Sequence, residues 1–259
     1  MARSLERIQQ EITAQEKAIG LLVTEFQTIY SQYLTLLGQA LHQQLMQASY
    51  HVCTQGYPES FLALSFDGRH QLQQDLRKIS KESQAELRSH LERWLKEWEV
   101  GEQFLAVKLP KMNYPFSKLQ EEIEEEIAKT LQNISIQTNQ LLQDRGIIPH
   151  KLPSKVLEAA AKSEASTEMN PGAANLLNLV VETKNDEDPE DSNLMRILAI
   201  NLRLSEIEFS DSSLTVTRNQ IRSLAAKGGK LQRDYRKIQR ELAIAKAEAA
   251  WRSSWFEDN

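Results

Sequence analysis

The sequence is poor in cysteine, glycine and proline. Among its 259 residues there is one cysteine, with nine glycines and seven prolines. A lone Cys53 cannot form an internal disulfide, which excludes a cysteine-stapled secreted miniprotein and favours a reducing compartment. So few glycines and prolines exclude collagen-like chains, and 41% hydrophobic residues exclude a wholly disordered one. We therefore expect a real core, in one large domain or two small ones.

Long apolar runs are also missing. No window of about 20 residues is apolar enough to span a bilayer, and the N-terminus lacks a signal-peptide core. Phe26–Pro58 comes nearest because it has no Asp, Glu, Lys or Arg, but its seven glutamines would be costly in hydrocarbon. We expect a cytoplasmic chain, neither secreted nor transmembrane, with association at a membrane surface left open.

Motifs of common enzymes are absent as well. The five histidines form no H-E-x-x-H, Cys53 has no second cysteine for a metal cluster, and no serine lies in G-x-S-x-G. Ala226–Lys230 lacks the full phosphate-loop pattern, so its glycines favour a helix kink or a close backbone approach. Carboxylates in Glu121–Glu126 fan out on a helix and favour a solvated face. We expect no enzyme, no catalytic residue, no metal and no cofactor.

Apolar residues spaced three and four apart, by contrast, are abundant. One such seam starts at Leu5 and ends at Gly56–Pro58, a second helix is predicted from Asp67 to Val100, and a third from Ser117 to Gly146. The last seam runs over five heptads. Its members are Leu214, Thr217, Ile221, Leu224, Gly228, Leu231, Tyr235, Ile238, Leu242, Ala245 and Ala249.

These seams predict an all-α fold, an elongated helical bundle or antiparallel coiled coil of long helices with an irregular linker. The first and last seams have similar lengths and either pair with each other or with another chain. The predicted divisions are an N-terminal helical domain over 1–145, a linker over 146–191 and a long basic helix over 192–259. Short helices are expected over Ser154–Lys162, Pro171–Glu182 and Leu194–Leu204. Whether 170–182 packs on the domain, the favoured alternative, or docks elsewhere stays open.

The net charge of −5 hides a strong asymmetry. Arg218–Arg252 contains ten Lys or Arg against three acidic residues, a balance of +7, so the rest of the chain carries −12. The basic residues outside the seam are Arg222, Lys230, Arg233, Arg236, Lys237 and Arg240. A solvated face is the commonest role for such residues, and the functional alternatives are binding to anionic lipid, to nucleic acid or to acidic protein segments. Nucleic acid is less favoured, because these basic residues lack aromatic or base-reading support.

Aromatic residues gather instead at the end of the chain. Trp251 and Trp255 share a helix face, and Phe256 follows them. We expect them to pack on the protein, with an anchor into a partner pocket or a membrane interface as the alternative.

Two stretches, Tyr50–Pro58 and Ala247–Asp258, resemble an uncharacterised group of helical cyanobacterial proteins. The resemblance covers a minority of the chain and includes no catalytic motif. It implies a cytosolic protein of a photosynthetic bacterium, near internal membranes, and no activity.

Long seams without a convergent polar cluster predict a non-enzymatic scaffold or adaptor acting through protein–protein interaction. Its partners are expected to be other proteins or further copies of the chain. The alternative is a peripheral binder of anionic membrane or nucleic acid that uses the basic C-terminal helix.

Overall fold

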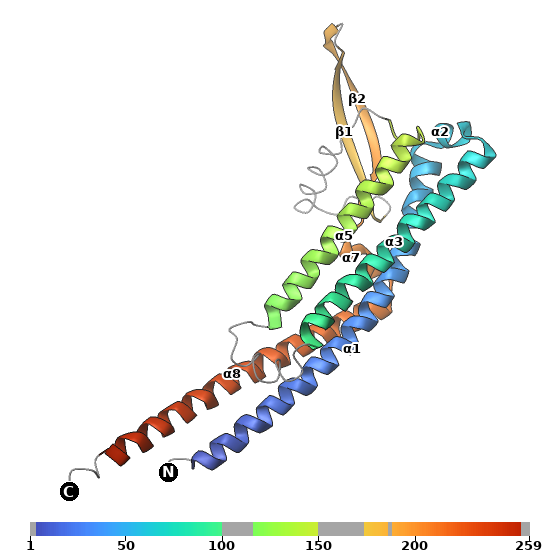
Figure 1. Ribbon diagram of the computed structural model, residues 1–259. Coiled ribbons are helices and arrows are strands. Elements are labelled where there is room, and N and C mark those ends of the chain that lie inside the picture. Colours follow the sequence, from blue (N-terminus) through green and yellow to red (C-terminus); the bar gives the residue numbers. More distant parts are fainter. Residues whose placement is uncertain (1–3, 100–115, 150–173, 186–187, 255–259) are drawn as a thin grey trace. The chain divides into compact units, whose positions relative to one another are not determined.

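A computed structural model describes residues 4–99, 116–149, 174–185 and 188–254. Within these ranges the chain is helical apart from one two-stranded hairpin, which confirms the all-α fold (Figure 1). The elements are α1 (Leu5–His51), the π-helical turn η1 (Val52–Gly56), α2 (Pro58–Ala63), α3 (Phe66–Glu99), α5 (Phe116–Asp144), β1 (Leu176–Asn185), β2 (Asp188–Ile200), α7 (Leu204–Ser210) and α8 (Ser212–Ser254). Among the described helices, none combines the length and the apolarity needed to cross a membrane.

The three helices predicted before residue 146 are confirmed nearly to the residue. The end of the third is explained by Gly146, whose φ of 71° is the left-handed backbone that favours glycine after a helix. The helix expected over Ser154–Lys162 lies outside the described residues. The predicted divisions at residues 145 and 191 stay predictions.

The chain forms two compact units. Unit 1 comprises Met1–Tyr33, His90–Glu124 and Val216–Asn259, and unit 2 comprises Leu34–Ser89 and Glu125–Thr215. The basic helix therefore belongs to unit 1, and the hairpin belongs to unit 2.

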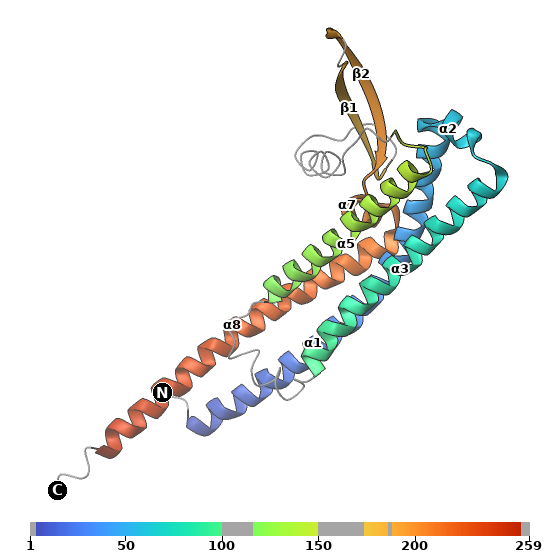
Figure 2. The same cartoon turned by 45° about the horizontal axis from the view of Figure 1, so that its top comes forward.

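In unit 1, the first part of α1 and residues 218–235 of α8 lie side by side and antiparallel (Figures 1 and 2). The Tyr235 hydroxyl donates to Glu16 Oε1 at 2.9 Å, and the Arg218 guanidinium lies 5.9 Å from the ring centroid of Tyr33. Glu16 and Tyr33 are 17 residues apart, as are Arg218 and Tyr235, so the register is constant between the two pairs. The seam that joins the helices is buried at Ile8, Ile12, Ile19, Leu22, Phe26, Ile221, Leu224 and Tyr235.

Unit 1 also contains a buried ion pair. Arg218 is only 6% exposed, and its guanidinium lies 2.7 Å from Glu124 Oε1 on α5. The acidic stretch around Glu124 was expected to be solvated, and Glu121 and Glu122 are indeed exposed. Glu124 departs from that expectation, because it neutralises a cation that the apolar seam encloses.

In unit 2, the helices predicted over Pro171–Glu182 and Leu194–Leu204 are wrong where the structure describes them. Both segments form strands, which pair antiparallel with Leu177 opposite Ala199 and Leu179 opposite Ile197. Leu177, Ile197 and Ala199 are buried. Short apolar runs fit a strand as well as a helix, and here tertiary contacts decide between them.

Those contacts come from Tyr57 and from side chains of α5, which form hydrogen bonds with the backbone of β2 and of the residues after it. Tyr57 accepts the Leu198 N–H at 3.0 Å, and Asn139 both donates to the Ile200 carbonyl at 2.8 Å and accepts the Ile200 N–H at 2.9 Å. Ser135 Oγ accepts the Leu202 N–H at 2.9 Å. Alternate backbone groups are thus satisfied by α5 and Tyr57 instead of by a third strand.

A second group of hydrogen bonds, centred on Asn175, lies at the base of the hairpin. Asn175 has a positive φ of 61° and is fully buried, yet it makes four hydrogen bonds. Its N–H donates to Glu206, its amide donates to Gln44 Oε1 at 2.9 Å, and its side-chain oxygen accepts the Arg203 N–H at 3.0 Å. Its carbonyl accepts the Asn201 N–H at 2.9 Å. Because all four polar groups are bonded, the strained backbone has a structural explanation.

Candidate interaction surface

All six basic residues that the sequence singled out on α8 are exposed: Arg222, Lys230, Arg233, Arg236, Lys237 and Arg240. No ion pair joins them to any other residue in the part of the chain that the structure describes. We call this set the α8 row. It differs from Arg218, which lies on the same helix but is buried against Glu124.

Helix geometry places the α8 row opposite the seam. At about 100° per residue, its six members fall within an arc of about 120°, while the seam residues centre on the other side of the helix. The distance from Arg222 to Arg240 is about 27 Å along the axis at 1.5 Å per residue. Asp234 is the sole acidic residue of that stretch, and it falls outside the arc. One face of α8 thus packs on α1, and between residues 222 and 240 the opposite face presents positive charge alone.

The helix is unbroken through its two adjacent glycines. α8 runs from Ser212 to Ser254 across Gly228 and Gly229, and Gly228 is buried on the seam side. A phosphate loop needs a turn after a strand, and none is formed here. Continuous helix keeps the α8 row on one line.

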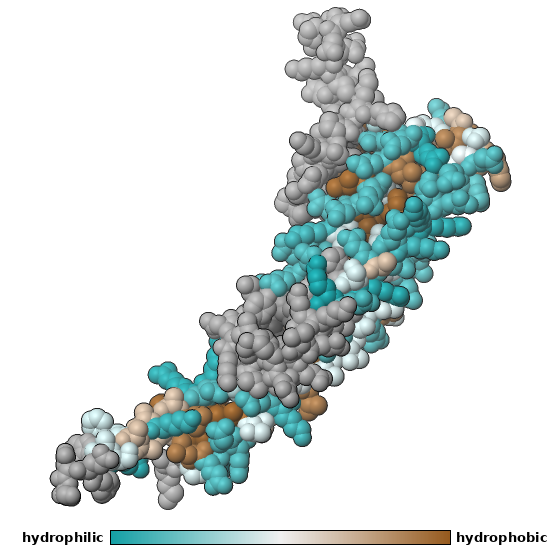
Figure 3. Space-filling model, in the orientation of Figure 1, coloured by the Kyte–Doolittle hydropathy of each residue, from teal (hydrophilic) through white to brown (hydrophobic). Residues whose placement is uncertain are grey.

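Apolar side chains extend that line toward the C-terminus. Ile244 is 51% exposed and Trp251 is 66% exposed, and both fall within the arc of the α8 row. Figure 3 shows hydrophobic side chains interspersed with hydrophilic ones at this end of unit 1. Trp251 is thus largely exposed, and Trp255 and Phe256 lie outside the described residues. Sequence reasoning missed Ile244, although its position four residues after Arg240 was a signal.

The register of the helix pair explains why Trp251 is exposed. Continued from the Glu16–Tyr235 pair, it places Leu5, the first residue of α1, opposite position 246 of α8. Residues 247–254 therefore extend beyond the start of α1, and every one of them is exposed.

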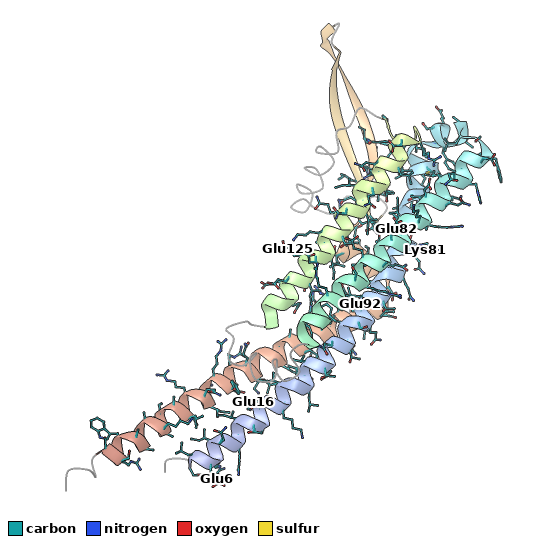
Figure 4. The ribbon with its side chains drawn as sticks, in the orientation of Figure 1. Glu6, Glu16, Lys81, Glu82, Glu92 and Glu125 are labelled. Atoms are coloured by element: carbon teal, nitrogen blue, oxygen red, sulfur yellow. The ribbon has the colours of Figure 1, made fainter. Side chains whose placement is uncertain are left out.

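Other groups in the described residues do not converge on a reactive site. No three His, Cys, Asp or Glu side chains gather there to hold a metal ion, and the labelled Glu6 and Glu16 lie at separate places along α1 (Figure 4). Cys53 is buried, which raises the pKa of its thiol to about 11 and leaves it a poor nucleophile. His42 Nδ1 lies 2.8 Å from Ser80 Oγ, but Ser80 is fully buried and offers no access to a substrate.

Comparison with models of known protein families, with curated proteins and with solved structures finds no match to this chain. The resemblance to helical cyanobacterial proteins thus stays an expectation from two short stretches. Fold and surface together define a class only: an all-α protein with one exposed, positively charged helix face.

Proposed function

We propose that the chain is a non-enzymatic helical scaffold or adaptor whose docking face is the α8 row. The observation that carries the proposal is the difference between the two opposite faces of α8. Its seam is buried by contacts within one chain, and its opposite face carries six exposed cations. A partner protein with an acidic surface matches that face.

The α8 row places like charges next to one another along the helix that bears it. Arg233 and Lys237 are four residues apart, as are Arg236 and Arg240, so they form like-charge pairs on neighbouring turns. Each such pair destabilises an isolated helix by about 0.2–0.5 kcal/mol.

Partner capture with matched variants tests the proposal. The double variant Arg233→Glu with Lys237→Glu reverses two charges of the α8 row. Its control, Lys227→Glu with Lys246→Glu, reverses two exposed charges of the same helix outside the arc. We expect a tagged wild-type chain and the control to retain a partner that the row variant loses.

Light scattering after size-exclusion chromatography decides whether that partner is a second copy. A row-dependent dimer identifies self-association as the scaffold's mode. A wild-type chain that is a monomer and retains no partner contradicts the proposal.

A second candidate function is peripheral binding to an anionic membrane or nucleic acid through the same face. The observation that favours it is the apolar extension of the α8 row at Ile244 and Trp251.

A further inference from the structure

We propose that the α8 row docks on an anionic lipid surface, with Ile244 and Trp251 entering the membrane interface beyond it. This inference rests on the second candidate function, peripheral binding through the same face, and names an anionic lipid surface as the occupant. The juxtaposition that carries it is a row of cations and two exposed apolar side chains on one line of one helix.

The shape of the row fits a plane. A flat surface that meets a straight helix can contact only one arc of it, and the six cations lie within about 120°. The same arc reaches from Arg222 to Trp251, about 44 Å along the axis. A bilayer surface can engage all of these side chains at once without bending the helix.

The charge of the row fits phosphate headgroups. Clusters of four to eight Lys or Arg on one helix face are typical of binding to anionic lipids, and each cation near such a surface contributes about as much as a fivefold change in affinity. Asp234 lies outside the arc, so no carboxylate within the row from 222 to 240 opposes the attraction.

The apolar end favours lipid over nucleic acid. Tryptophan is enriched at membrane–water interfaces, where its ring is buried and its N–H stays hydrated. A nucleic-acid duplex offers phosphates along a 27 Å row but no apolar layer beyond them for Ile244 and Trp251. The described helices do not span a bilayer, so the attachment is peripheral.

The helix needs no folding step to bind. The other face of α8 packs on α1 through buried residues, namely Tyr235, Leu224 and Ile221. The cations are therefore presented on a preformed helix. A peptide that folds on the membrane has to be ordered first, and a preformed face avoids that loss of entropy.

Vesicle co-sedimentation of the full chain tests the inference. The probes are phosphatidylcholine vesicles with and without phosphatidylserine, over a range of salt concentrations. We expect binding to the anionic vesicles only, weakening as salt rises. Arg233→Glu with Lys237→Glu should weaken binding about 30-fold or more, whereas Lys227→Glu with Lys246→Glu should weaken it far less.

The apolar end has its own readout. Trp251→Ala should weaken binding severalfold without changing its dependence on salt, and brominated lipids should quench less tryptophan fluorescence in this variant. Leu21→Ala, which removes a 66%-exposed apolar side chain from α1, serves as its control and should bind like the wild type.

Three outcomes overturn the inference. One is no binding to anionic vesicles at low salt, and another is equal losses in the row variant and its control. The third is binding to duplex DNA or to polyglutamate as tight as to vesicles of equal charge, which reassigns the row to nucleic acid or acidic protein. If vesicles fail while a protein partner still depends on the row, the proposed scaffold stands and only its lipid occupant is wrong.

Discussion

Units 1 and 2 differ in the polar contacts that accompany their apolar cores. Unit 1 is joined by an apolar seam that includes polar contacts such as Tyr235 to Glu16 and Arg218 to Glu124. Unit 2 also buries an apolar core, for example at Leu41 and Leu131. It adds side-chain amides and hydroxyls that bond the backbone, as Asn139 bonds both polar groups of Ile200. The face of α8 opposite the seam is exposed, whereas the polar side chains described in unit 2 form hydrogen bonds within that unit. The proposed docking face belongs to unit 1.

The largest expected loss of stability is in unit 2, from Asn139→Ala. This variant leaves the buried N–H and carbonyl of Ile200 without their bonds to Asn139, so the free energy of unfolding should fall by about 3 kcal/mol. Urea denaturation followed by circular dichroism measures it. Asn133→Ala, on the exposed side of the same helix, should cost less than about 0.5 kcal/mol. Equal effects in the two variants would contradict the role given to Asn139.

In unit 1, the ion pair should matter less. Glu124→Gln removes the charge that pairs with buried Arg218, and we expect a loss of about 1–2 kcal/mol because Glu124 itself is a third exposed. The exposed neighbour gives the control, Glu122→Gln, which should be neutral. A loss as large as that of Asn139→Ala would show that unit 1 depends on polar contacts as much as unit 2 does.

Tyr235→Phe should cost about 1 kcal/mol near neutral pH, since it removes the bond to Glu16. Burial and that bond raise the pKa of Tyr235 from 10 to about 12. The folded chain therefore holds the phenolic proton more tightly than the unfolded chain does. This stabilisation is complete below pH 10 and is lost as the pH rises toward 12.

Denaturation of wild type and Tyr235→Phe across that pH range measures the difference. We expect the gap between the two chains to shrink above pH 10, while Tyr50→Phe, at a 60%-exposed site on α1, follows the wild type. A gap that stays constant or widens would contradict the buried, neutral hydroxyl.

The smallest expected change in stability belongs to the α8 row. Arg233→Glu with Lys237→Glu should leave the free energy of unfolding within about 0.5 kcal/mol of wild type while removing binding. A large destabilisation would show that the row is part of the fold, and the contrast between the two faces of α8 would fail.

The same contrast explains what the sequence could predict. An apolar seam, such as Ile12, Ile19 and Phe26 in α1, specifies a helix from local sequence alone. The helices α3 and α5 have seams of the same kind, and their ends were predicted to within two residues. The hairpin was not predictable in this way. Leu176–Val181 and Leu194–Ile200 are short apolar runs, and their strand state depends on Asn139 and other residues distant in sequence.

The candidate surface was predictable in part. The basic residues of the α8 row follow from their spacing alone, but the exposure of Trp251 does not. Exposure depends on where α1 begins opposite α8, and only the Glu16–Tyr235 and Tyr33–Arg218 pairs fix that register. The role proposed for Ile244 depends on the same register.

One measurement tests both faces of α8 directly. Single cysteines at Thr217, Leu224, Arg222 and Arg233, in a Cys53→Ala background, are labelled with a water-soluble thiol reagent with and without anionic vesicles. We predict that the seam positions Thr217 and Leu224 react slowly throughout, while Arg222 and Arg233 react fast and become protected by vesicles. Seam cysteines that react as fast as the row cysteines, or row cysteines that vesicles leave unprotected, would contradict the account.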